Sequence, residues 1–323
     1  MKKYILALLL LPIFSLSALL PANAATPAPC PGAMTMPMDM TTHPAHSLGD
    51  GTSLNAVGYQ MNIIEQPNAS KNINTFKFNI LGYDKLPLKK YTLDMGKILH
   101  LLVYSSDFKT YIHAHPQVDS NGTFTYTLPL KQKGTYHYIA DISTPINDKT
   151  NPTVQLIFGG SFDYGTKTVL GNLPLPQCKI ASNGYNLELS QKVLDLAHGS
   201  LMINVFDKKG NPVSFGTYLG ARAHLVVFKE KSLAYGHFHP MNVDGSMPIM
   251  WGKVVSSTDK NVKTFADSPA IDFKAKPDTQ PGMLHFMTEP PGAGRYIAFL
   301  QFVVKGKIET TSFTFDAKDF SKK

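Results

Sequence analysis

The 323-residue sequence lacks the motifs by which the common enzyme classes are recognised. It contains no Gly-x-Ser-x-Gly nucleophile elbow, no His-Glu-x-x-His zinc motif, no phosphate-binding glycine loop and no dinucleotide fingerprint. Its 23 acidic residues are sparse, and no two of them stand out as an acid–base pair. We therefore expect a protein that is not an enzyme. A copper-dependent redox activity is the one catalytic alternative that a histidine-rich site leaves open.

Long apolar runs are missing too, except at the N-terminus. There, two lysines precede an apolar run over residues 4–20, and Ala22-Asn23-Ala24 supplies the small residues that a signal peptidase requires. The run is too short for a membrane span, and no other run reaches about 18 apolar residues. We predict a signal peptide cleaved after Ala24, no membrane span, and a secreted or periplasmic mature protein.

Positive charge is in excess, but it is not concentrated. The formal net charge is +8, yet no basic helix and no run of interleaved basic and aromatic residues occurs. Proteins that bind nucleic acid usually carry such a stripe. Nucleic acid is therefore not an expected partner.

Cysteine is scarce, with only Cys30 and Cys178 in the chain. An oxidising compartment permits a disulfide between them, which would tie the N-terminal arm to the interdomain linker. Free thiols and soft metal ligands are the alternatives.

From about residue 57 onward, short alternating apolar runs rich in Val, Ile, Thr, Tyr and Phe are separated by turn residues. This sequence pattern is typical of strands and hairpins. It predicts an all-β fold of two tandem immunoglobulin-like antiparallel β-sandwiches. The second half carries a longer insertion, roughly over residues 254–281. The predicted organisation is a signal peptide over 1–24, a disordered Met/His-rich arm over 25–55, a first β-sandwich over 56–170, a linker over 171–180 and a second β-sandwich over 181–319.

A histidine signature occurs twice with identical spacing. Each copy has one histidine that opens an apolar run and a His-x-His-Pro segment that follows 13 residues later, and the second copy begins 124 residues after the first. A repeat of this length predicts two homologous domains. The histidines of the first copy are His100, His113 and His115, and those of the second are His224, His237 and His239.

These histidines are candidate metal ligands. The two of each His-x-His segment lie on one face of a strand, where paired imidazoles suit a transition metal. Whether His100 joins His113 and His115 depends on the register of the hairpin. If the numbers of two paired residues add up to an odd number (an odd-sum register), His100 lies opposite His113 or His115 on the same face. In an even-sum register it lies on the other face. A fourth contributor from the following strand would be Asp141 or His137 in the first domain and Gln301 in the second. The alternative is that the histidines only stabilise the fold.

The predicted arm carries a second candidate metal site. Methionine recurs there at every second position, and two histidines follow. Thioether sulfur suits Cu(I), and imidazole extends the arm towards Cu(II). The alternative is a passive low-complexity tail. The candidate ligands of the arm are Met34, Met36, Met38, Met40, His43 and His46.

Three stretches of the sequence resemble secreted bacterial proteins with YtkA-like, immunoglobulin-like β-sandwich modules. They are the segment from His224 to Pro240, the Gly-x-Tyr strand at 294–302 and the strand at 307–315, and the first half repeats the pattern at 100–116 and 134–141. A looser resemblance connects the chain to periplasmic copper-resistance β-sandwiches. These resemblances imply handling of heavy metals, especially copper.

The leading hypothesis is a secreted copper-binding protein that sequesters the ion or delivers it, with copper as its ligand and a metal-trafficking protein as a further partner. The rival is a secreted interaction or adhesion protein that binds a protein or glycan, in which the histidines are purely structural.

Overall fold

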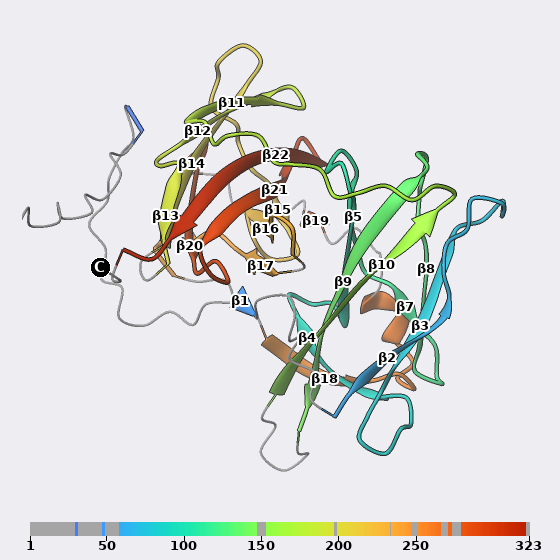
Figure 1. Ribbon diagram of the computed structural model, residues 1–323. Helices are drawn as coiled ribbons and strands as arrows, with labels where there is room; N and C mark the ends of the chain where they lie inside the picture. The colour runs from blue at the N-terminus through green and yellow to red at the C-terminus, as the bar shows by residue number, and fades with distance from the viewer. Residues whose placement is uncertain are drawn as a thin grey trace, which may run out of the picture.

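The structure is a computed structural model that describes residues 30–31, 47–48, 58–146, 153–196, 199–232, 234–246, 251–265, 271–272 and 279–320 (Figure 1). Within these residues the chain forms strands and one short 3-10 helix, η1 (Val262–Phe265), and no α-helix. The predicted all-β fold is thus confirmed. The predicted signal peptide and nearly all of the predicted arm lie outside the described residues.

The first β-sandwich consists of two facing sheets. One has the strand order β2-β3-β8-β7, and the other has the order β18-β4-β9-β5-β6, with β10 paired to β9. The strands of this sandwich are β2 (Gln60–Glu65), β3 (Thr75–Leu81), β4 (Lys90–Asp94), β5 (Leu99–Ser105), β6 (Tyr111–Ala114), β7 (Gln117–Val118), β8 (Thr123–Thr127), β9 (Gly134–Pro145), β10 (Thr153–Tyr164) and β18 (Trp251–Ser256).

The second β-sandwich repeats this plan. Its sheets have the orders β1-β17-β16-β21-β22-β13 and β11-β12-β14-β20, with a two-stranded ribbon of β15 and β19 beside them. Its strands are β1 (Ser47–Leu48), β11 (Lys179–Ser182), β12 (Tyr185–Leu189), β13 (Val193–Asp195), β14 (Gly199–Asp207), β15 (Thr217–Tyr218), β16 (Ala223–Lys229), β17 (Tyr235–Phe238), β19 (Ile271–Asp272), β20 (Met283–Thr288), β21 (Gly294–Val304) and β22 (Lys307–Lys318).

Strand β5 is buried on both of its faces, which explains its unbroken apolar sequence. Leu99, Leu101 and Val103 point into the core of the first sandwich. Leu102 and Tyr104 point the other way, into a second apolar cluster. Side chains alternate along a strand, so a strand between two packed layers needs apolar residues at nearly every position.

That second apolar cluster joins the two sandwiches. From the first sandwich it takes Leu102 and Tyr104, and from the second it takes Val226, Phe228 and further residues of β17 and β21. The two larger sheets therefore pack against each other through the faces that turn away from their own cores. The linker takes part as well, because Leu173 is buried in the same cluster.

The insertion of the second half contributes a strand to the first sandwich, contrary to its expected place within a second β-sandwich over 181–319. Strand β18 pairs with β4, with Val255 opposite Tyr91. Val255 and Val262 are buried in the core of the first sandwich. The edge of β4 presents unpaired backbone groups that a strand from elsewhere in the chain can satisfy. A strand from the second half of the chain is consequently part of a sheet of the first sandwich, which links the two sandwiches.

Cys30 and Cys178 form a disulfide, so the predicted pairing is confirmed and the alternative of free thiols or metal-binding cysteines is wrong. Cys30 is buried, and its backbone N–H donates to the carbonyl of Ser190 at 2.8 Å. Further along, Ser47 pairs with Gly236 where β1 adds to the edge of β17. The segment between Cys30 and β1 is thus attached to the second sandwich at both of its ends.

Removing this disulfide is expected to lower the free energy of unfolding by about 2–5 kcal/mol, because it closes a loop with a sequence separation of 148. The measurement is urea denaturation of a Cys30→Ser/Cys178→Ser variant beside the oxidised wild type. Reduced wild type should unfold at the same urea concentration as the variant. Equal stability of all three samples would contradict the prediction.

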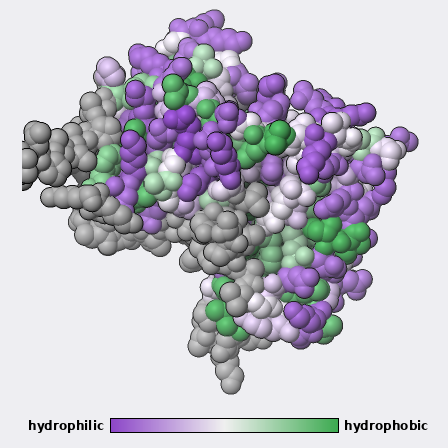
Figure 2. All heavy atoms as spheres, viewed as in Figure 1, coloured by the Kyte–Doolittle hydropathy of each residue, from purple (hydrophilic) through white to green (hydrophobic). Residues whose placement is uncertain are grey.

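The face of the molecule in Figure 2 is mostly hydrophilic, with smaller apolar groups scattered among the polar residues. No helix in the described part of the chain is long and apolar enough to cross a membrane. The main apolar clusters are instead the two sandwich cores and the layer between them.

Candidate metal centre

A tight turn before β5 orients the first histidine of the signature. Met95 and Gly96 have positive φ angles of 46° and 76°, and the flanking Asp94 and Lys97 exchange two backbone hydrogen bonds of 2.9 and 2.8 Å. This is the pattern of a two-residue hairpin turn, which requires φ above zero at both central positions. The turn leaves the carbonyl oxygen of Asp94 at 3.2 Å from Nε2 of His100.

The second sandwich repeats this arrangement residue by residue. Leu219 and Gly220 have φ angles of 49° and 80°, and the carbonyl oxygen of Tyr218 lies 2.8 Å from Nε2 of His224. In a neutral imidazole one nitrogen carries the proton and the other the lone pair. When Nε2 donates to the turn carbonyl, both histidines present the Nδ1 lone pair towards the His-x-His segment.

Of the two alternative hairpin registers, the structure has the odd-sum one, which places His100 on the same face as the His-x-His segment. Leu102 lies opposite His113 in the β5–β6 pairing, which brings His100 to the level of His115. In the second sandwich Val226 lies opposite His237 in the same register.

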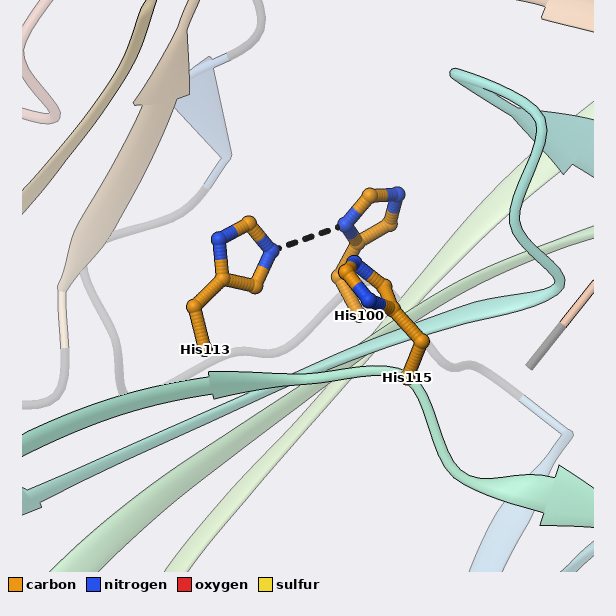
Figure 3. Close-up of side chains that lie close together, drawn as sticks. All are labelled: His100, His113 and His115. Atoms are coloured by element: carbon orange, nitrogen blue, oxygen red, sulfur yellow. Dashed lines mark hydrogen bonds between the residues drawn. The ribbon is translucent and has the colours of Figure 1, made fainter. Parts of the chain in front are cut away.

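His100, His113 and His115, here called the first triad, converge at the end of β5 and β6 (Figure 3). Nδ1 of His100 lies 3.0 Å from Nε2 of His113. The ring of His115 is 4.9 Å from each of the other two, measured between centroids. Each residue offers one nitrogen, and these three atoms all lie within 4.8 Å of one another.

His224, His237 and His239, here called the second triad, converge more tightly. Nδ1 of His224 lies 3.2 Å from Nε2 of His237 and 3.0 Å from Nε2 of His239. Nitrogen ligands bind a transition metal at about 2.0–2.1 Å, which puts two ligands about 2.9 Å apart at a right angle and about 3.3 Å apart at a tetrahedral angle. The observed separations therefore fit three ligands of one ion.

Burial keeps four of these imidazoles neutral, those of His100, His115, His224 and His237. Burial, followed by the neighbouring charge of His113, lowers the pKa of His224 to about 3. Burial is also the largest cause that holds the pKa of His100, His115 and His237 well below the usual range, and the other histidines add to it. A neutral imidazole is the form that binds a metal, so protons compete only weakly for these sites.

A buried carboxyl group beside the first triad favours a cationic ligand. Asp94 is buried, and its Oδ2 lies 3.9 Å from Nε2 of His100, while its Oδ1 has no hydrogen-bond partner. Burial, and then the charge of Asp141, raises the pKa of Asp94 well above its usual range. Oδ1 of Asp94 is thus a buried oxygen without a partner beside the neutral imidazole of His100. A bound cation at this place would offset the cost of burying that oxygen.

The residues predicted as a fourth ligand lie in different places. Asp141 lies outside the first triad, because its carboxylate accepts hydrogen bonds from Nε2 of Gln155 at 2.8 and 2.9 Å and from the hydroxyl of Tyr235. His137 also points elsewhere, with its Nε2 at 3.0 Å from the Ser106 hydroxyl.

Gln301 does contact a triad, but it is that of the other domain. Its Oε1 accepts a hydrogen bond from Nδ1 of His113 at 2.9 Å. This arrangement directs Nε2 of His113 towards His100, as a hydrogen-bonded carbonyl commonly does for a metal-binding histidine. The sequence offered Gln301 as a contributor to the second triad. The structure does pair Gln301 with His224 on the neighbouring strand, but its contact with His113 across the interface was not predicted.

The six predicted ligands of the arm, Met34, Met36, Met38, Met40, His43 and His46, lie outside the described residues. Sequence reasoning missed Asp94 and Tyr235. Tyr235 had a usable signal, since Tyr111 occupies the matching position of the first copy.

Residues 55–155 and 180–319 match the family described as a domain of unknown function, DUF8832. The chain belongs to the DUF8832 family. The first matched segment covers the first sandwich up to the start of β10, and the second covers the second sandwich together with β18 of the first. None of the curated proteins matches the chain.

Solved structures resemble this DUF8832 protein only weakly. MtrC from Shewanella baltica is 9% identical, with 81% of this chain and 70% of that chain covered and a TM-score of 0.24. The BSP domain of a biofilm-associated protein is 12% identical, with coverages of 80% and 29% and a TM-score of 0.19. A titin fragment is 10% identical, with coverages of 81% and 98% and a TM-score of 0.19. Similarities at this level indicate no function.

Proposed function

We propose that this DUF8832 protein binds copper and acts in its sequestration or delivery outside the cytoplasm. The observation that carries the proposal is the convergence of three imidazole nitrogens in the second triad at 3.0 and 3.2 Å. A transition metal binds such a set, and Cu(II) favours the near-right angles that separations close to 2.9 Å correspond to. The methionine-rich arm, which remains a prediction, would add the soft ligands that Cu(I) prefers.

Sequestration or delivery is favoured over catalysis by burial. His224, His237 and His239 are each at most 3% exposed, so an ion among them has little room for a substrate. A disulfide supports an oxidising compartment, in agreement with the predicted secretion. The resemblance to YtkA-like modules and to copper-resistance β-sandwiches points in the same direction.

The metal-free wild type is expected to take up Cu(II), and a His113→Ala/His115→Ala/His237→Ala/His239→Ala variant is expected to lose the uptake by both triads. A His137→Gln/His285→Gln variant is the matched control, because it removes two histidines whose Nε2 atoms contact Ser106 and Ser200 instead of a triad. Binding is measured by competition with a chelator and by metal analysis after dialysis. The candidate ligands of the arm are replaced by serine in all three proteins, so that they do not mask the result while Cys30 and β1 stay in place.

Near-ultraviolet circular dichroism confirms that each variant is folded. Negligible uptake by a folded wild type would overturn the proposal and leave the histidines as structural groups. Equal uptake by the wild type and the quadruple variant would place the copper elsewhere in the protein.

A further inference from the structure

The two triads lie on the faces that the sandwiches turn towards each other. Residues two and four positions after the first histidine share its face, and in β5 these are Leu102 and Tyr104 of the interdomain cluster. In β16 the corresponding residues are Val226 and Phe228, of the same cluster. The triads thus continue the apolar interface between the sandwiches.

No gap separates one triad from the other. Centroids of His113 and His237 are 5.3 Å apart, as are those of His100 and His237, and those of His113 and His224 are 5.8 Å apart. Within the triads the corresponding separations are 4.6–5.4 Å. Histidines from different domains are therefore about as close as histidines of the same triad.

The contacts across the interface are nearly symmetric. His113 and His237 occupy matching positions of the two repeats, and each lies beside the first histidine of the opposite sandwich. The turn carbonyls that orient His100 and His224 also match. Both triads are consequently presented to a common centre by the same local structure.

The second sandwich also positions a ligand of the first. Gln301 on β21 accepts the hydrogen bond from His113, and its own amide Nε2 donates to Oγ1 of Thr310 at 3.2 Å, which fixes which end of the amide faces His113. A second polar contact crosses the interface where the hydroxyl of Tyr235 donates to Asp141. The docked second sandwich therefore orients one of the three ligands of the first triad.

From this geometry we propose that the six histidines form one dinuclear copper centre, in which two ions bind side by side across the interface and share a bridging ligand. The inference rests on the proposed function of the triads. Each ion takes three imidazole nitrogens, and a bridging water or hydroxide joins the two ions, as in other two-metal sites. The carboxyl groups of Asp94 and Asp141 lie beside the centre and supply counter-charge in a buried environment.

The experiment uses metal-free protein in which the candidate ligands of the arm are replaced by serine, and loads it with one and then two equivalents of Cu(II). Electron paramagnetic resonance counts the isolated ions, because two Cu(II) ions with a shared bridge couple their unpaired electrons and lose the ordinary mononuclear signal. We expect the wild type to bind two ions and to lose more than half of its signal at two equivalents. His115→Ala and His239→Ala are the matched single-triad variants, and each is expected to bind one ion with a full mononuclear signal.

A third variant tests whether the second sandwich completes the first triad. In the His239→Ala background, Gln301→Leu removes the acceptor for His113 and is expected to weaken binding at the first triad about 10- to 100-fold. Gln301→Glu, which keeps an acceptor at this position, should restore most of the affinity. Unchanged affinity in the Gln301→Leu variant would contradict the cross-domain role.

The outcomes separate this inference from the proposed function. Two ions that bind independently, each with a full mononuclear signal, would overturn the dinuclear centre and leave copper binding intact. One ion shared by all six histidines would do the same. No uptake by the folded wild type would overturn both.

Discussion

Replacing Phe228 by alanine is expected to lower the free energy of unfolding by about 3–5 kcal/mol and to weaken Cu(II) binding at the same time. Phe228 belongs to the second sandwich, but its ring centroid lies 4.1 Å from that of Tyr104 in the first. It is fully buried between the sandwiches and also contacts Tyr111 and Phe299. Its truncation leaves a cavity in the layer that aligns the two triads.

The matched control is Phe315→Ala, because Phe315 is buried in the core of the second sandwich alone and stacks on Tyr296. Both variants should shift the urea midpoint to a similar extent. Only Phe228→Ala should also reduce Cu(II) affinity, by about tenfold, which corresponds to 1.4 kcal/mol. Equal affinities of the two variants would show that the interface does not support the metal centre.

The metal-free protein is expected to lose stability steeply as the pH falls below about 6.5, the ordinary pKa of histidine. Burial lowers the pKa of six histidines in the folded state. Four of them belong to the triads, and for His224 the pKa is about 3. Below pH 6.5 the unfolded chain takes up protons that the folded chain refuses. Each such histidine therefore removes about 1.4 kcal/mol of unfolding free energy per pH unit, so His224 alone removes about 4 kcal/mol between pH 6.5 and 3.5.

Two buried carboxyl groups oppose this trend without cancelling it. Burial raises the pKa of Asp141 to about 6 and that of Asp94 well above its usual range. Between pH 6 and their unfolded pKa, near 3.9, the folded chain holds protons that the unfolded chain has lost, which favours folding as the pH falls. Because six histidines act against two carboxyl groups, the net effect of acid is destabilising.

The measurement is the urea midpoint of the metal-free protein at several pH values between 7.5 and 4.5. A His224→Gln variant should show a shallower dependence, by about 1.4 kcal/mol per pH unit. Wild type loaded with Cu(II) should have a higher urea midpoint than the metal-free protein and a profile that is at least as steep, because a bound ion stabilises the folded state and keeps its histidines unprotonated. A flat profile of the metal-free wild type would contradict the burial of neutral histidines.

Local patterns in the sequence predicted those parts of the site that depend on residues close together in the chain. The repeated His-x-His-Pro segment indicated two homologous sandwiches, and strand alternation indicated a shared face for each histidine pair. The odd-sum register was one of two alternatives, and the structure confirms it in both copies. The residues two and four positions after each first histidine are apolar, which indicates that the face of the strand carrying that histidine packs against another layer.

Contacts between distant segments were not predictable in the same way. Asp141 and Gln301 occupy matching positions of the two repeats, yet Asp141 accepts from Tyr235, whereas Gln301 orients His113. These choices depend on which side chains the docked partner presents. The exchange of β18 into the first sandwich was missed for the same reason, since an unpaired strand edge has no signature that names its partner.

The sequence by itself thus determined two β-sandwiches, each with a His-x-His pair on one face of a strand, because alternation and repeat spacing are properties of consecutive residues. The tertiary structure alone decided that both faces meet. The apolar residues beside the histidines are buried against each other. This packing places ring centroids of the two triads 5.3–5.8 Å apart. The six histidines belong to two separate segments of the sequence, and in the folded protein their side chains lie together as one cluster.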